Sequence, residues 1–138
     1  MTQTFTHKVT YYETDKMGVT HHSNYIRFME EARIDYLEKI GYPYSKMEEE
    51  GVISPVVSVE CNFKSPSTFA DELLIAVSLN DYTGVKFVFE YVMKNKTTDA
   101  VVAVGKTEHC FTTPAGMPII IKKRFPELHK HFSELIEK

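Results

Sequence analysis

The central part of the chain alternates apolar and polar residues, which is the pattern of β-strands that bury one face. Runs of this kind cover residues 57–64, 73–79 and 85–93, and a longer run covers residues 100–111. A shorter alternating stretch covers residues 4–12 near the N-terminus. The pattern therefore predicts five strands.

Short polar segments separate the last three of these strands. Residues 80–84 (NDYTG) and 95–99 (NKTTD) have the length and composition of hairpin turns. We therefore expect the three strands to form an antiparallel meander. The apolar face of the last strand changes near Gly105, which predicts a bulge or bend at that point.

A helical period replaces the alternation between Ser23 and Ile40. With about 3.6 residues per turn, its apolar side chains cover roughly half of the helix circumference. Gly41, followed by Pro43, ends the pattern. So wide an apolar arc is typical of a helix that a sheet wraps. A shorter amphipathic helix is predicted over residues 126–137.

One charged residue interrupts the apolar arc of the longer helix. Arg33 projects into its middle, and Glu30 stands one turn earlier at its edge. The spacing favours an intrahelical pair at i, i+3, with the arginine stem packed on the core. A functional or interface role for Arg33 stays open beside that interpretation.

Together these elements predict an α+β domain in which a curved antiparallel sheet wraps one long central helix. With 138 residues, 43% of them hydrophobic, the chain has enough apolar mass for one core, so we expect a single domain over residues 1–138. A single sheet of this size leaves edge strands and an outer face to be covered. We therefore expect a homodimer or homotetramer, with pairing of sheet edges as one route.

Composition and charge narrow the possible partners. The formal net charge of -3 offers no basic surface for nucleic acid, and the only local cationic run is Lys122-Lys123-Arg124. The two cysteines, Cys61 and Cys110, are far apart and suggest neither a disulfide framework nor a zinc site. The N-terminus lacks the apolar core of a signal peptide, and no stretch approaches a membrane span. These features indicate a cytoplasmic protein.

Titratable residues gather in the segment YYETDKMGVTHHSNYIRFMEEAR, residues 11–33, at the junction between the first strand and the long helix. Asp15 lies in a glycine-containing loop that leads to the helix start, where backbone N–H groups are unpaired. A carboxylate beside such donors can activate water or attack a carbonyl while the donors stabilise the oxyanion. The alternative is that Asp15 caps a turn or the helix start.

The neighbouring histidines and tyrosines have open roles as well. His21 and His22 are adjacent, so one of them at most faces a given pocket, and no metal-binding spacing such as HExxH accompanies them. His22 fits either the orientation of a substrate or a capping role. Tyr11 and Tyr12 are expected on opposite faces of a strand. No GxSxG, P-loop or GxGxxG motif occurs, so serine or cysteine nucleophilic chemistry has little support.

The segment 11–33 resembles the opening motif of the 4-hydroxybenzoyl-CoA thioesterase-like acyl-CoA thioesterases, hotdog-fold proteins of the kind associated with the Tol-Pal gene cluster. The match includes the tyrosine pair, the aspartate before a glycine-bearing loop, the histidine, Asn24-Tyr25 and the Glu-x-x-Arg pair. The later FKSPSTFADELLI is similar to the second-strand region of that family. Lys16-Met17 and Thr20-His21 depart from the family pattern, so its acyl preference does not transfer.

The resemblance implies the hotdog fold, acyl-CoA thioesterase activity and roles for particular residues. Asp15 matches the catalytic general base or nucleophile, and Tyr11 and His22 match the residues that accompany it. The helix N-terminus near His22 would polarise the thioester carbonyl, and Tyr25 would contact the substrate. Four basic residues are candidates for the coenzyme A phosphates at a subunit interface: Lys64, Lys122, Lys123 and Arg124.

The expected activity is hydrolysis of a small or medium acyl-CoA to the free acid and CoA. No metal and no separate cofactor is expected, because CoA is part of the substrate. Two other functions stay open: an enoyl-thioester hydratase or dehydratase on the same fold, and a non-catalytic acyl-CoA-binding module.

Overall fold

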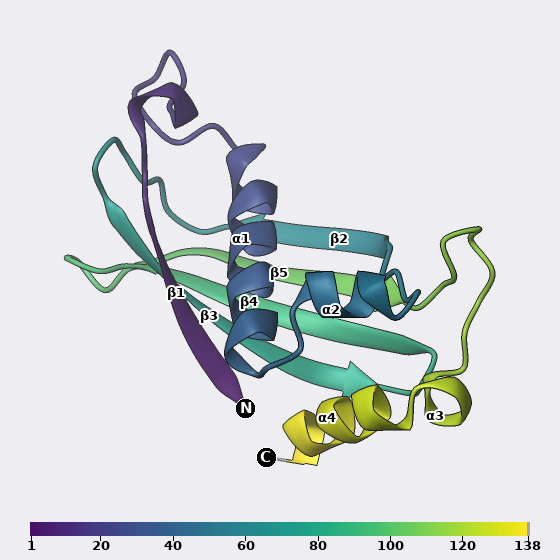
Figure 1. Cartoon of the computed structure of the whole chain (residues 1–138). Helices are drawn as coiled ribbons and strands as arrows, with labels where there is room; N and C mark the ends of the chain where they lie inside the picture. Colours follow the sequence, from purple (N-terminus) through teal and green to yellow (C-terminus); the bar gives the residue numbers. More distant parts are fainter. Residues whose placement is uncertain (138) are drawn as a thin grey trace.

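A computed structural model describes residues 1–137 of the chain, and the side chains of residues 1–136. The described part is α+β, with five strands, a short 3-10 helix and four α-helices (Figure 1). In chain order the elements are β1 (Thr2–Lys8), η1 (Tyr11–Glu13), α1 (Asn24–Lys39), α2 (Tyr44–Glu49), β2 (Val56–Phe63), β3 (Glu72–Tyr82), β4 (Lys86–Asn95), β5 (Val101–Cys110), α3 (Ile121–Arg124) and α4 (Pro126–Glu137).

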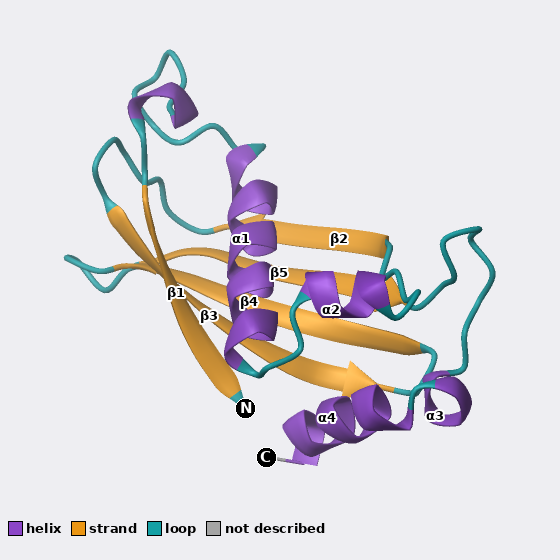
Figure 2. Cartoon of the chain, in the orientation of Figure 1, coloured by secondary structure: helices purple, strands orange, loops and turns teal. Residues whose placement is uncertain are grey.

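The strands form one antiparallel sheet in the order β1-β3-β4-β5-β2. The predicted meander of the last three strands is confirmed, because β3, β4 and β5 are neighbours joined by short turns. Figure 2 shows α1 crossing one face of the orange sheet, with α4 beside the end of β3. β1 and β2 are the two edge strands.

Three local features differ from the sequence prediction. β1 ends at Lys8, and the chain then turns into η1, so the predicted strand over residues 4–12 is too long. α2 and α3 were not predicted; α2 begins directly after Pro43, whose fixed φ suits the start of a helix. The expectation of one long helix is met only in part, because α1 has 16 residues and three further helices accompany it.

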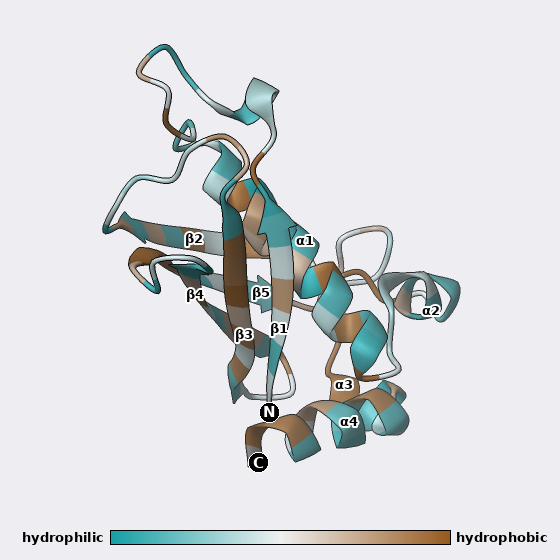
Figure 3. Ribbon diagram, turned by 90° about the vertical axis from the view of Figure 1, so that its left-hand side faces the viewer, coloured by the Kyte–Doolittle hydropathy of each residue, from teal (hydrophilic) through white to brown (hydrophobic). Residues whose placement is uncertain are grey.

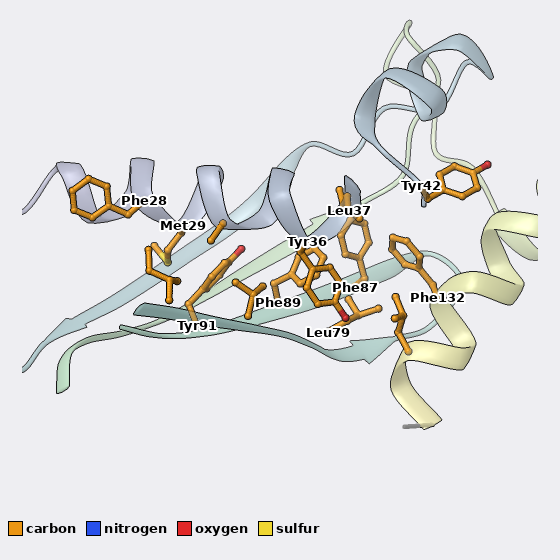
Figure 4. Packing of buried hydrophobic residues seen from close by; sticks show 14 of the residues in the cluster. Phe28, Met29, Tyr36, Leu37, Tyr42, Leu79, Phe87, Phe89, Tyr91 and Phe132 are labelled. Atoms are coloured by element: carbon orange, nitrogen blue, oxygen red, sulfur yellow. The ribbon is translucent and has the colours of Figure 1, made fainter. Parts of the chain in front are cut away.

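The apolar side of α1 packs on the sheet and forms the core with it. Phe28, Met29 and Tyr36 are fully buried, and the Tyr36 ring lies 5.3 Å from that of Phe89 on β4 (Figure 4). α4 extends the core, because the Phe132 and Phe87 rings are 5.2 Å apart. Each such side chain contributes about 1.5–3 kcal/mol when it is buried. Figure 3 shows hydrophobic and hydrophilic residues interleaved along α1 and α4, as expected for helices with one buried side.

Arg33 lies within this core and makes an unexpected set of contacts. Its side chain is only 6% exposed, and it donates from Nε to the Tyr44 hydroxyl (3.0 Å) and from Nη1 to the Tyr91 hydroxyl (3.1 Å). Tyr91 also shares a hydrogen bond of 2.6 Å with Thr107. Among the described residues Arg33 forms no ion pair with Glu30, so the predicted i, i+3 pair is wrong. Arg33 hydrogen-bonds to two tyrosine hydroxyls instead, while Glu30 and Glu48 line the cavity beside it without an ion pair to it.

The β5 irregularity lies at Val102 rather than at Gly105. Met93 pairs with Ala103 and Lys94 pairs with Val101, so Val102 is the extra residue of a bulge. Val102 and Ala103 are consequently both buried, and the apolar face changes there. Gly105 serves the packing of α1 instead, because a Cβ at this position would collide with the Met29 side chain.

Replacement of Gly105 by alanine should therefore lower the free energy of unfolding by about 1–3 kcal/mol, since the added methyl group overpacks the core against Met29. Urea denaturation of the two proteins measures the difference. In the matched double variant, Gly105→Ala with Met29→Ala, the two effects should be less than additive. Full additivity would show that Met29 is not the residue that excludes a side chain at position 105.

Candidate active site

The loop that carries Asp15 is a tight turn held by its own backbone. The Asp15 N–H donates to the Val19 carbonyl (2.8 Å), and the Gly18 N–H donates to the Asp15 carbonyl (2.9 Å). Gly18 has φ of +80, a conformation that glycine adopts without the steric cost of a side chain. An isolated bridge between Thr14 and Thr20 closes the turn. The sequence thus places Asp15 at the first corner of a fixed loop.

The Asp15 carboxylate is half-buried and only partly engaged. Its Oδ1 accepts a hydrogen bond from the Met17 N–H (2.8 Å), so the residue does cap a turn, as one of the two sequence interpretations had it. Within the described residues, Oδ2 has no hydrogen-bond partner. One oxygen therefore fixes the carboxylate, and the other is available for chemistry.

A cavity of about 380 Å³ lies beside this carboxylate, between the loop, the start of α1 and the end of β2. It brings together four of the residues predicted from sequence: Asp15, His22, Tyr25 and Lys64. The remaining lining residues are Met17, Val19, Thr20, Phe63, Ser65 and Pro66.

His22 stands at the mouth of the cavity, just before α1 begins at Asn24. Its backbone N–H has no acceptor within the described part of the chain, whereas Asn24 and Tyr25 donate to His21 and His22 carbonyls. The start of a helix carries a partial positive charge from aligned peptide dipoles. His21 lies outside the cavity lining, as expected for adjacent residues, with its ring stacked 4.2 Å from that of His22. The site thus brings to one cavity a carboxylate with an unbonded oxygen and a residue, His22, whose backbone N–H has no acceptor among the described residues.

A buried hydrogen-bond chain supports the cavity wall and was not predicted from sequence. The Ser67 hydroxyl, fully buried, shares hydrogen bonds with Tyr25 OH (2.8 Å) and with Thr20 Oγ1 (2.7 Å). Thr20 N–H also donates to the Ser67 carbonyl (2.8 Å). Burial raises the pKa of Tyr25, which keeps its hydroxyl protonated. These residues fix the loop to the α1 start. The only sequence signal for Ser67 is its position in the KSPS stretch.

Tyr11 lies outside this cavity. It belongs to η1 and is 76% exposed, with its ring 5.7 Å from that of Phe69. Tyr12 is 82% exposed, and neither tyrosine of the pair lines the cavity. The reason is local: η1 replaces the extended strand whose period would have sent the two rings to opposite faces.

Three of the predicted basic residues lie elsewhere in the fold. Lys122, Lys123 and Arg124 form most of α3, which Figure 1 shows near α4, away from the loop that carries Asp15. All three are exposed, and none lines the cavity. Lys64 is the basic residue that lines it.

Two further features of the described residues bear on the chemistry. Among the described side chains, residues 1–136, no group of three His, Cys, Asp or Glu is placed to hold a metal ion. Within residues 1–137, every helix falls short of the length and apolar content that crossing a membrane requires.

Comparison with known proteins agrees with the arrangement of the fold. Residues 9–130 match the sequence model of the Thioesterase-like superfamily. The chain belongs to this superfamily. The match covers the loop that carries Asp15, α1 and the strands β2 to β5.

Several relatives have names that specify the reaction. YneP of Bacillus subtilis, named provisionally as an acyl-CoA thioesterase, is 32% identical over 127 residues, which are 92% of each protein. The acyl-CoA thioesterase YbgC of Haemophilus influenzae is 26% identical over 125 residues, covering 88% of this chain and 92% of YbgC. The crystal structure of a DHNA-CoA thioesterase from Staphylococcus aureus has a TM-score of 0.91 and 30% identity, covering 96% of this chain and 89% of that protein.

Removal of the Ser67 hydroxyl tests the chain that supports the cavity. Ser67→Ala should lower the free energy of unfolding by about 1–3 kcal/mol, because it leaves the buried Tyr25 hydroxyl without a partner, whereas Thr20 Oγ1 keeps its hydrogen bond to the Ser67 carbonyl. The matched control is Ser78→Ala, whose exposed hydroxyl bonds only to Asn80 and whose loss should be neutral. Equal urea midpoints for the two variants would contradict the supporting role of Ser67.

Proposed function

We propose that this member of the superfamily is an acyl-CoA thioesterase that hydrolyses a small or medium acyl-CoA to the free acid and CoA. The observation that carries the proposal is the shared cavity of the Asp15 carboxylate and the free His22 N–H at the start of α1. The names of the relatives point to the same reaction class.

The reaction can be built from these two groups. The thioester carbonyl oxygen would accept a hydrogen bond from the His22 N–H, and the positive end of α1 would stabilise the charge that develops on it. Asp15 Oδ2 would either deprotonate a water molecule that attacks the carbonyl carbon or attack that carbon itself. In the first route, the CoA thiolate leaves the tetrahedral intermediate and takes up the proton that Asp15 removed from water. In the second route, departure of the thiolate leaves an anhydride between the acyl group and Asp15, which a water molecule then hydrolyses to the free acid and the Asp15 carboxylate, and one of the two protons released goes to the thiolate. A thiolate is a good leaving group, so one carboxylate and one polarising helix end suffice.

Other residues of the cavity would bind the substrate. We assign the His22 ring and Tyr25 to the acyl side of the thioester, and Lys64 to a phosphate of CoA. Lys122, Lys123 and Arg124 could contact the phosphates only from a neighbouring copy of the chain. Tyr11 has no place in this mechanism, because its exposed ring does not line the cavity. The mechanism needs no metal and no cofactor beyond the CoA of the substrate.

We further propose that the chain acts as a homo-oligomer built on a dimer. β2 is an edge strand whose Val57, Val59 and Phe63 side chains are exposed, although their alternation predicted a buried face. An unpaired apolar edge of this kind pairs readily with another chain. A second copy on β2 would bury this face and complete the wall of the cavity, which Phe63 lines.

The surroundings of Arg33 support the same interface. A second cavity, of about 440 Å³, lies between α1 and α2 and is lined by Arg33 together with the exposed apolar residues Ile34 and Ile53. Arg33 is buried among neutral hydroxyls, and a buried cation needs a compensating charge. We infer that a second copy covers this cavity, so that two sheets and two α1 helices form the complete hotdog arrangement around the sites. We propose that the protein acts in the cytoplasm, where CoA thioesters are formed and used.

The role of Asp15 is tested by Asp15→Asn. Asparagine keeps the acceptor for the Met17 N–H, so the turn should persist, but turnover of acyl-CoA should fall by at least about 100-fold. Release of free thiol from short, medium and aromatic acyl-CoAs measures the rate. The matched control is Asp71→Asn: Asp71 caps a neighbouring turn by accepting the Thr68 N–H (2.8 Å) and does not line the cavity.

Undiminished thiol release by Asp15→Asn would refute the assignment of Asp15. Hydration of an enoyl-CoA without thiol release would identify a hydratase instead. Saturable acyl-CoA binding without any turnover would identify a binding module.

Assembly through β2 is tested by placing a charge on the exposed edge. Val59→Lys should convert the oligomer to a monomer in sedimentation velocity, because lysine on an edge strand opposes strand pairing. Ile120→Lys is the matched control, since Ile120 is similarly exposed but lies next to α3. A monomeric wild-type protein, or an oligomer that tolerates Val59→Lys, would contradict the proposed interface.

A further inference from the structure

A histidine outside the cavity is held between two carboxylates from different elements. His7 Nε2 lies 2.8 Å from Glu13 Oε1, and His7 Nδ1 lies 3.0 Å from Glu31 Oε2. His7 is on β1, Glu13 on η1 and Glu31 on α1. The His7 ring also packs on Phe28, with centroids 4.0 Å apart. These contacts connect the strand, the 3-10 helix and the long helix at one point.

Glu13 is the centre of this group. Its side chain is buried, with the residue only 5% exposed, and Oε1 also accepts the Thr10 N–H (2.8 Å). Burial alone would raise the pKa of Glu13, but the hydrogen bonds from Thr10 and His7 outweigh it, so the pKa lies below its usual value. Glu13 therefore stays ionised, and its charge is compensated inside the fold.

The backbone of Glu13 reaches the other end of the catalytic loop. Its carbonyl accepts hydrogen bonds from the His21 N–H (2.8 Å) and from Asn24 Nδ2 (2.9 Å). Asp15 lies two residues after Glu13, and His22 lies one residue after His21. The carboxylate and the N–H donor of the site thus belong to two segments that meet at Glu13.

We propose that Glu13, held by His7, is a positioning residue that sets the distance between the Asp15 carboxylate and the His22 N–H. The inference rests on the proposed thioesterase function, but it concerns residues that touch neither substrate nor water in the mechanism. Reacting groups must be placed closely, because a displacement of about 1 Å can lower a rate about 100-fold. Without the Glu13 side chain, η1 loses its hydrogen bond to His7 on β1 and, through His7, its link to Glu31 on α1, so the loop can shift.

The experiment compares Glu13→Ala and Glu13→Gln with the wild-type protein. Glu13→Ala should lower kcat by about 10- to 100-fold and leave KM unchanged, because CoA and the acyl group still have their contacts. Glu13→Gln keeps an oxygen that can accept the Thr10 and His7 hydrogen bonds, so it should recover most of kcat. The matched control is Glu72→Ala, which removes an exposed ion pair with Lys96 (3.4 Å) and should change neither constant.

A second measurement separates positioning from general destabilisation. Hydrogen exchange at the Thr10 and His21 amides should become faster in Glu13→Ala, while exchange in the central strands β4 and β5 stays slow. A folded Glu13→Ala protein with wild-type kcat would overturn the proposal. So would a kcat loss that Glu13→Gln does not recover, or one accompanied by faster exchange throughout the sheet.

The failure of the positioning proposal differs from the failure of the proposed function. If the wild-type protein releases no thiol from any acyl-CoA, the thioesterase function fails as well. Normal thiol release by both the wild-type protein and the Glu13 variants refutes the positioning role alone.

Discussion

The structure depends on the burial of the apolar side of α1 against the antiparallel sheet. Phe28, Met29 and Tyr36 lie fully buried between helix and strands, and this packing fixes the position and direction of the helix. Because the helix is fixed, its N-terminal end stays at one place relative to the end of β2. The polar groups of the site lie at or near that end of α1. The packing of the core therefore determines where the helix start could polarise a bound carbonyl group. The adjoining loop adds its carboxylate and is tied to the helix start through Thr20, Ser67 and Tyr25.

Much of the fold could be predicted because its signals are periodic. Burial of one face of a strand or helix produces a periodic pattern of apolar residues in the sequence. This pattern is the alternation in residues 73–79 and 85–93 and the helical period before Gly41. α4 follows its predicted bounds for the same reason. α2 has only six residues, of which Met47 is the one buried, and so short a segment leaves no measurable period.

The candidate site was predictable where it depended on neighbours in sequence. Asp15, His22 and Tyr25 come from one segment, and the structure places them around one cavity, which the predicted Lys64 also lines. The position of Tyr11 in η1 was missed, because a 3-10 helix of three residues is too short to leave a periodic pattern in the sequence. Ser67 was missed because its partners Thr20 and Tyr25 are more than forty residues away. Contacts of that kind follow from the fold and leave no local pattern.

Phe63 belongs to two structures at once, since it lines the cavity and is exposed on the edge strand β2. Any residue that replaces it alters the shape offered to the acyl group and, in the proposed assembly, the surface offered to the neighbouring subunit. In the proposed assembly, a substitution of Phe63 would therefore change both the acyl groups that the cavity accepts and the strength of subunit association. Divergence toward a new acyl group in this lineage would have to proceed through side chains that satisfy both demands, which narrows the evolutionary routes open to the pocket.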